Sequence, residues 1–313
     1  MGQLIVRKEA LDEIANLVAR DPRVVFIGSD LGAGVMADAM EQFPDRVLME
    51  GIAEQHLVGM ASGMALEGFV PYVHTIGTFL TRRALEQVII DAALHKLPVR
   101  LIASGGGMVY APLGPTHQAI DDFALMRAVD GMAVLSPIDP QEMEEAISAL
   151  ADWPGPAYVR LGKGGEPVVT EPGFSIGPLR HLAVGTDLLV LTTGAVGHEA
   201  LSAATELHES SHAISLVHVP TISPLDEASV LELIANHPKT IVIEEHMPLG
   251  GLWTAIVESA MRHGVRCDVH QASLPVGYAQ RYGSQIDHWR ASGLSKDGLA
   301  HRFKALIGGP SHG

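Results

Sequence analysis

Short apolar runs without polar alternation recur along the chain, and they restrict its possible folds more than any other feature. They lie at residues 24–28, 70–76, 99–104, 132–137, 157–161, 188–193, 214–219 and 240–245. Such runs are typical of parallel strands that are covered on both faces. Helix-like stretches separate them, at 8–20, 53–66, 80–95, 119–129, 140–150, 197–207, 226–236 and 252–263. The alternation predicts an α/β fold of open sheets flanked by helices, with ligand-binding residues near strand ends.

A segment rich in glycine and proline, residues 162–178, divides these runs into two series. Neither a long helix nor a central strand tolerates that composition. A length of 313 residues also suits two domains. We therefore predict two successive domains, 1–174 and 175–313, each built on one open sheet.

The net charge is −15, and no block of lysine or arginine interrupts it. Such a surface repels phosphate backbones and anionic lipid, so nucleic acid and membranes are not expected partners. An anionic substrate would need a local basic pocket. The sequence has no signal-like start and no apolar run of membrane-spanning length, which predicts a soluble cytoplasmic protein.

Glu54 stands at the start of a helix-like stretch made almost entirely of apolar and small residues. Burial would suit this carboxyl to keep its proton and donate a strong hydrogen bond. The alternative is an ordinary first-turn glutamate that the helix dipole favours. Gly59 and Gly63 lie four residues apart in the same stretch, where they permit either a subunit interface or tight packing inside the domain.

Two further segments follow predicted strands. Phe79 comes just after a strand, where it can stack on a planar ring or pack in the core, and Arg82 and Arg83 follow it. A glycine-rich loop then leads to Thr116, a candidate helix N-cap, and to His117, a candidate site residue among sixteen histidines. Metal-binding, dinucleotide-binding, P-loop and nucleophile-elbow motifs are absent from the sequence.

Five short motifs together resemble the thiamine-diphosphate enzymes of the transketolase and deoxyxylulose-phosphate synthase group. They are GIAEQH (51–56), GTFLTR (77–82), GPTHQ (114–118), TTGAVGHEAL (192–201) and VIEEHMPLGGL (242–252), in the order of that family's second half. The resemblance implies a pyrimidine-binding domain followed by a transketolase C-terminal domain. The family's diphosphate-binding GDG…N motif is absent, which implies that a separate subunit holds the diphosphate and Mg²⁺, in an α₂β₂ assembly. The chain alone is then expected to bind coenzyme poorly and to be inactive.

The resemblance also implies residue roles. Glu54 matches the glutamate that hydrogen-bonds the coenzyme's pyrimidine nitrogen and activates it, and Phe79 matches the aromatic residue that stacks on that ring. Further cofactor positions are Asp30, Leu31, Ile76 and Arg82. Substrate-binding positions for a sugar phosphate are Arg7, Arg160 and the catalytic His117, guanidinium being well suited to phosphate.

Two positions depart from the family pattern. Leu113 replaces an aspartate that contacts a substrate hydroxyl, and Ile76 replaces an aromatic residue near the pyrimidine. The first hypothesis is transfer of a two-carbon ketol unit from a ketose phosphate to an aldehyde. Leu113 keeps open a diverged enzyme that uses pyruvate or an unusual acceptor, and a non-catalytic subunit is the third possibility.

Overall fold

The computed structural model describes residues 6–279 and 281–309, which form two compact units. One unit contains the residues up to Gly106 together with Leu125–Ile176. The other contains Gly107–Ala124 together with the residues from Gly177 onward. The chain thus contributes a short internal segment to the second unit before it completes the first, and the loop sequence of that segment contains no sign of which core it joins.

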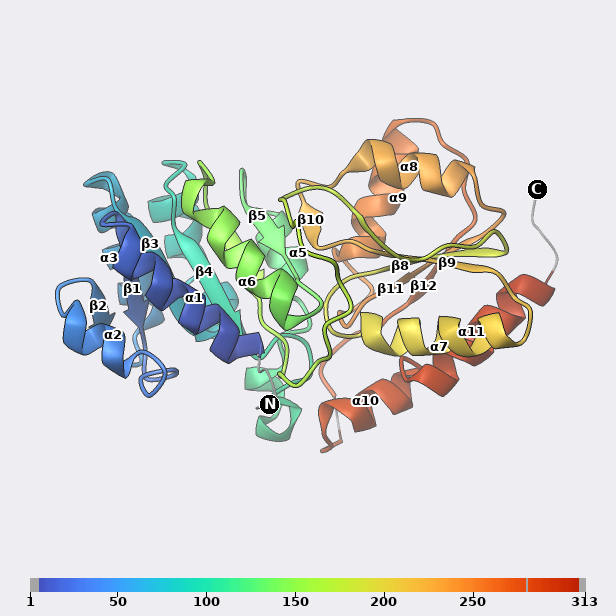
Figure 1. Ribbon diagram of the computed structural model, residues 1–313, viewed down its shortest axis with the longest axis horizontal. Helices are drawn as coiled ribbons and strands as arrows, with labels where there is room; N and C mark the ends of the chain where they lie inside the picture. The colour runs from blue at the N-terminus through green and yellow to red at the C-terminus, as the bar shows by residue number, and fades with distance from the viewer. Residues whose placement is uncertain (1–5, 280, 310–313) are drawn as a thin grey trace. The chain divides into compact units, whose positions relative to one another are not determined.

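The first unit is built on a parallel sheet (Figure 1), and most residues of its strands are buried. They lie in the order β5-β6-β4-β3-β1-β2. Their bounds are β1 (Val24–Gly28), β2 (Val47–Met49), β3 (Val70–Ile76), β4 (Arg100–Ser104), β5 (Ala133–Leu135) and β6 (Ala157–Arg160). The apolar runs without alternation predicted β1, β3, β4, β5 and β6, as expected for parallel strands that are covered on both faces, whereas β2 is only partly buried.

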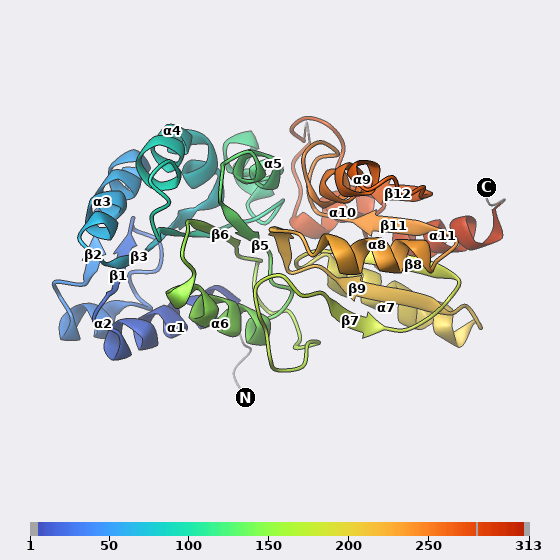
Figure 2. The same ribbon diagram turned by 90° about the horizontal axis from the view of Figure 1, so that it is seen from above.

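Helices cover the two faces of that sheet. In Figure 2, α1 and α6 lie along one face, and α3 and α4 lie on the other. The helices of this part of the chain are α1 (Val6–Arg20), α2 (Ala37–Gln42), α3 (Glu54–Leu66), α4 (Leu85–Gln87), α5 (Asp122–Arg127) and α6 (Pro140–Ala149). A large apolar cluster between the sheet and the α1–α6 layer forms the core of this unit.

The single helix predicted at 80–95 is wrong in detail. The backbone forms a π-helical turn at Phe79–Arg83, the one-turn helix α4, and a second π-helical turn at Val88–Ala93. A π-turn holds one more residue than an α-turn, and it shifts the direction of the side chains that follow. Sequence periodicity cannot distinguish the two, because the apolar pattern stays nearly helical.

The second unit has a five-stranded sheet in the order β12-β11-β8-β9-β7. Its pairs are parallel except for β7, which runs antiparallel to β9 at the edge. The strands in this part of the chain are β7 (Arg180–Ala183), β8 (Leu188–Thr192), β9 (Ile214–His218), β10 (Thr221–Ser223), β11 (Thr240–Ile243) and β12 (Val269–Ala272). The helices are α7 (Gly197–Glu209), α8 (Glu227–Ala235), α9 (Leu252–Arg262), α10 (Gln285–Ser292) and α11 (Lys296–Gly308). α7 and α11 lie on one face, and α8 and α9 on the other (Figure 1).

The predicted α/β class, with two sheets flanked by helices, is confirmed. Elements that the sequence did not predict are β2, β7, β10, β12, α2, α10 and α11. Several are very short, and β7 and β12 are only partly buried, so they lack a continuous apolar run. No helix within 6–279 or 281–309 combines the length and apolar character that crossing a membrane requires.

Candidate functional site

The carboxyl ends of the first sheet gather most of the residues predicted from the sequence. Parallel strands end at the same edge of a sheet, and loops at that edge are where α/β proteins bind ligands. Asp30 and Leu31 follow β1, Glu54 follows β2, Ile76 ends β3, Phe79 and Arg82 follow it, and Arg160 ends β6. These residues therefore lie on strand ends, loops and helix starts at one edge of the sheet.

Glu54 opens helix α3 as predicted, and only 1% of it is exposed. The hydroxyl of Thr75 donates to its Oε1 at 3.3 Å, and Arg83 Nη1 donates to its Oε2 at 2.6 Å. A buried carboxylate is costly unless it is paired and hydrogen-bonded, and the guanidinium supplies the opposite charge. Glu54 is thus a buried acidic group with defined partners, which the first-turn alternative did not anticipate.

Arg83 connects Glu54 to Phe79. Its guanidinium carbon lies 4.1 Å from the centre of the Phe79 ring, within the range of a cation–π contact. The two residues stand at the ends of the π-helical turn Phe79–Arg83, which brings both side chains beside the start of α3. The sequence singled out both arginines after Phe79, but it did not indicate which of them reaches Glu54.

His74 is a residue that the sequence did not single out. It lies in β3, is fully buried, and connects the loop after β1 to the end of β4, the strands on either side of β3. Its Nδ1 lies 3.0 Å from the Leu31 carbonyl, which can only accept, so Nδ1 donates and Nε2 accepts from the Ser104 hydroxyl at 2.9 Å. Burial, aided by the charge of Arg7, lowers the pKa of His74 to about 4. A histidine inside an otherwise apolar strand was the available signal.

The predicted arginines of this unit differ in exposure. Arg7 lies in the first turn of α1 and is half-buried, whereas Arg160 is only 6% exposed at the end of β6. Gly106 makes room for Arg160, because a Cβ on this glycine would come within 2.2 Å of Arg160 Cγ. Asp30 is exposed and accepts a hydrogen bond from the Ser29 hydroxyl at 3.0 Å.

The remaining predicted residues lie on the segment that packs into the second unit. Leu113 is 59% exposed at the end of a 3₁₀ turn, and His117 ends the next turn. The prediction that Thr116 caps a helix is wrong. The Thr116 hydroxyl lies 2.8 Å from His117 Nδ1, and the next helix begins only at Asp122.

The VIEEH motif organises the second unit. Glu244 accepts hydrogen bonds from the backbone N–H groups of Leu252 and Trp253 at the start of α9, at 2.7 and 3.2 Å. Glu245 is 5% exposed and accepts from the Met108 backbone N–H at 2.9 Å. These carboxylates accept hydrogen bonds from backbone N–H groups, which accounts for their positions without a catalytic role.

Exposed apolar residues lie along α3 and the π-turn next to it. Ile52, just before α3, and Leu66, at its end, are 65% and 66% exposed, and Ile89 and Ile90 of the adjacent π-turn are 40% and 48% exposed. A Cβ added at Gly63 would have no neighbour within 4 Å among the described residues, and one at Gly59 would meet only Asp91 Oδ2, at 3.9 Å. Tight packing inside the chain therefore does not explain these glycines.

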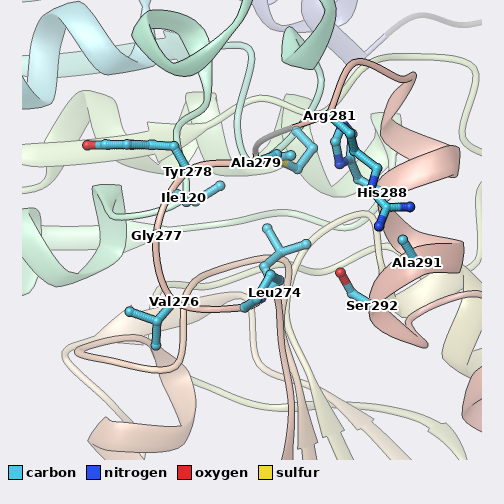
Figure 3. A pocket seen from close by; sticks show the side chains of 12 residues that line it. Ile120, Leu274, Val276, Gly277, Tyr278, Ala279, Arg281, His288, Ala291 and Ser292 are labelled. Atoms are coloured by element: carbon cyan, nitrogen blue, oxygen red, sulfur yellow. The ribbon is translucent and has the colours of Figure 1, made fainter.

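A pocket of about 320 Å³ lies within the second unit. In Figure 3, Arg281 and His288 are close together on one side of it, and Tyr278 and Val276 lie on the other. Burial lowers the pKa of His288, so its imidazole is mainly neutral near pH 7. None of the residues predicted for catalysis or binding lines this pocket, so the hollow itself does not identify the predicted site.

The space between the Glu54 carboxyl and the Phe79 ring suits a planar group with a nitrogen that can form a hydrogen bond to the carboxyl. The guanidinium of Arg83 has both properties and contacts both residues. An aminopyrimidine has them too, so the residues present fit that part of thiamine diphosphate. Among the described residues, no group of three or more His, Cys, Asp or Glu side chains could hold a metal ion.

Family models match most of the chain. The transketolase pyrimidine-binding domain matches residues 3–166, and the transketolase C-terminal domain matches residues 177–290. The chain is 35% identical to a putative uncharacterised transketolase family protein, y4mN, of Sinorhizobium fredii, over 85% of this chain and 79% of that one.

Two further relatives differ in how much of them the chain covers. It is 30% identical to one subunit of an apulose-4-phosphate transketolase from Phocaeicola vulgatus, over 95% of this chain and 96% of that one. It is 35% identical to 1-deoxy-D-xylulose-5-phosphate synthase of Anaeromyxobacter dehalogenans, but it spans only 46% of that enzyme's length.

Solved structures agree with this fold. A split-gene transketolase, an inactive β4 tetramer, superposes with a TM-score of 0.86 at 27% identity, over 98% of this chain and 99% of that one. The Campylobacter jejuni transketolase is 19% identical with a TM-score of 0.80, and it supports the fold alone. With both family models matched in order along the sequence, the chain belongs to the transketolase family.

Proposed function

We propose that this chain is one subunit of a two-chain, thiamine-diphosphate-dependent enzyme that transfers a two-carbon ketol unit from a ketose phosphate to an aldehyde. The observation that carries the proposal is the buried carboxyl of Glu54, joined through Arg83 to the ring of Phe79. An acidic group and an aromatic face around one planar space are what an aminopyrimidine requires.

In this proposal Glu54 holds a proton at a carboxyl oxygen and shares it with the pyrimidine nitrogen. Thr75, which donates to the other oxygen, keeps the carboxyl in one orientation. Phe79 provides the stacking face. When bound, the coenzyme supplies an electron sink for the bond that is cleaved. Burial of Glu54 excludes water from this hydrogen bond and so strengthens it.

The substrate in this proposal is a phosphorylated ketose. The chain carries a net charge of −15, so an anion needs local cations. Arg7 and Arg160 are the proposed phosphate-binding cations, with His117 as a substrate-binding and catalytic residue. The buried position of Arg160, for which Gly106 makes room, favours a defined geometry over a mobile surface charge.

The proposed partner is a separate subunit that carries the GDG…N domain and holds the diphosphate and Mg²⁺. The chain covers nearly the whole of a relative that is itself one subunit of a transketolase, which supports this division of labour. The exposed apolar face around Gly63 is the proposed contact surface, because nothing else among the described residues occupies it. An α₂β₂ assembly in the cytoplasm is the arrangement we propose.

A second candidate is a diverged reaction that uses pyruvate or an unusual acceptor. The observation that favours it is Leu113, which offers an exposed aliphatic side chain and cannot hydrogen-bond a substrate hydroxyl. The similarity to deoxyxylulose-phosphate synthase over 92% of this chain is compatible with this candidate.

The test uses the chain co-expressed with a GDG…N-bearing subunit. Depletion of xylulose 5-phosphate and an aldehyde acceptor is expected, and depletion of pyruvate without the sugar phosphate would replace the first candidate by the second. Glu54→Ala should lower turnover by about 10²-fold or more while the complex still co-elutes in size-exclusion chromatography. Glu86→Ala, at an exposed glutamate of α4, serves as the matched control. Full activity of the Glu54→Ala complex would contradict the mechanism.

A further inference from the structure

Arg83 makes both contacts that the proposed coenzyme site would offer a pyrimidine. Its Nη1 lies 2.6 Å from Glu54 Oε2, and its guanidinium carbon lies 4.1 Å from the centre of the Phe79 ring. A guanidinium is planar, delocalised and able to stack on an aromatic face, so it resembles a small nitrogen heterocycle in shape and in donor geometry.

The two carboxyl oxygens of Glu54 are both engaged. Thr75 donates to one at 3.3 Å, which is a long hydrogen bond, and Arg83 donates to the other at a short, charge-assisted distance. Glu54 is 1% exposed, so water cannot replace Arg83 unless the side chain moves. The guanidinium is therefore the stronger partner of this carboxylate.

Arg83 is free to leave without opening the core. The Arg83 side chain is 44% exposed, whereas that of Glu54 is fully buried. A rotation about the side-chain bonds of Arg83 would move the guanidinium into solvent, and the π-turn and α3 would keep their positions. The contact thus joins a fully buried acid to a partly exposed cation.

We infer that the Arg83 guanidinium is an internal stand-in for the aminopyrimidine, which means that it occupies the position between Glu54 and Phe79 that the ring would take. A pyrimidine must displace this guanidinium in order to bind. The inference rests on the proposed function, because it takes Glu54 and Phe79 as the pyrimidine-binding pair. Only chains in which Arg83 has moved away can bind the pyrimidine. The apparent pyrimidine affinity is therefore the intrinsic affinity multiplied by the fraction of such chains. The guanidinium also keeps the buried carboxylate neutralised until the pyrimidine arrives.

An ordinary stabilising ion pair predicts a different result. If Arg83 only supported Glu54 or bound the ligand itself, its removal would leave pyrimidine affinity unchanged or weaker. A stand-in predicts stronger pyrimidine binding after its removal, because the position between Glu54 and Phe79 is then open to the ligand.

The experiment uses the full chain and thiamine, whose ring can be tested without a diphosphate site, with binding measured by saturation-transfer NMR titration. Arg83→Ala is expected to bind thiamine about tenfold more tightly than the unmodified chain. Arg83→Lys keeps the charge but loses the flat stacking surface, so its affinity should lie between the two. It also tests the inference if Arg83→Ala does not fold, as judged by circular dichroism.

The matched control is Arg20→Ala. Arg20 is 56% exposed and pairs with the buried Glu13 at 2.7 Å, which reproduces the same kind of ion pair elsewhere in the unit. Thiamine affinity should not change in this variant. Equal or weaker binding by Arg83→Ala, with loss of binding in Phe79→Ala, would overturn the stand-in and leave the proposed function standing. Binding that is insensitive to Phe79→Ala and Glu54→Gln in the Arg83→Ala background would instead refute the proposed site.

Discussion

At the scale of single residues, His74 shows how a buried polar group can hold a site together. Its ring joins the loop after β1 to the end of β4, through the Leu31 carbonyl and the Ser104 hydroxyl. Both bonds require the neutral imidazole with its proton on Nδ1. Protonation would place a charge at a fully buried position and near Arg7, which is why the pKa is depressed. It would also remove the acceptor that the Ser104 hydroxyl uses.

The depressed pKa of His74 predicts an acid-sensitive fold. In the unfolded chain His74 takes up a proton near pH 6.5, whereas in the folded chain it stays neutral until about pH 4. The stability that neutral His74 contributes is therefore fully present above pH 6.5 and is lost as the pH falls toward 4. At pH 5 the free energy of unfolding is expected to be lower by about 2 kcal/mol. Urea unfolding at pH 7.5 and 5.0 should show this loss in the unmodified chain and not in His74→Gln.

The control for that measurement is His56→Gln, because the His56 side chain is 60% exposed. Its unfolding free energy should follow that of the unmodified chain at both pH values. An equal loss on acidification in His74→Gln and in the unmodified chain would contradict the role given to His74.

At the scale of an element, helix α3 has one face that is buried in the first unit and another that is exposed. One face buries Glu54, Leu57 and Ala61 against the first unit. The other presents Gly63 and Leu66 outward. Glycine inside a helix costs about 0.5–1 kcal/mol relative to alanine, and no neighbour within the described residues repays that cost.

Gly63→Ala should therefore separate folding from assembly. We expect the chain alone to gain up to about 1 kcal/mol in unfolding free energy, because alanine is the better helix former and no contact within 4 Å obstructs it. Association with the proposed partner subunit should weaken, as measured by analytical ultracentrifugation of the mixed chains. A stabilised variant that assembles normally would show that the partner does not approach this glycine.

At the scale of the whole molecule, one loop segment belongs to the second unit although the chain on both sides of it builds the first. Glu245 helps to hold it, through the Met108 backbone N–H at 2.9 Å and Gln285 Nε2 at 3.0 Å. Gly107 is required beside it, because a Cβ there would lie 2.3 Å from Glu245 Cδ. His117, on this segment, depends on that attachment for its position.

Glu245→Ala should release this segment. The buried donors left without an acceptor are expected to cost about 1–3 kcal/mol each, measured by urea unfolding. Limited proteolysis with mass spectrometry should show new cleavage within residues 107–124. Glu206→Ala, which breaks an exposed pair with Lys296, should cost less than about 1 kcal/mol and produce no new cleavage there. Protection of 107–124 in both variants would mean that Glu245 does not hold the segment.

The sequence by itself determined the α/β class, the buried parallel strands and the position of Glu54 at the start of its helix. These follow from local periodicity and from the order of motifs, which neighbouring residues along the chain are enough to specify. The same information placed Phe79 after β3, but it predicted one regular helix where two π-turns stand, because both share nearly the same apolar spacing.

Only the tertiary structure decided that Arg83 pairs with Glu54 over the Phe79 ring, that His74 joins two strand ends, and that 107–124 packs into the second unit. Each depends on residues distant in sequence that meet only after the sheets form. Charge, burial and hydrogen-bond geometry at such contacts are properties of the folded arrangement, and no single stretch of sequence contains them.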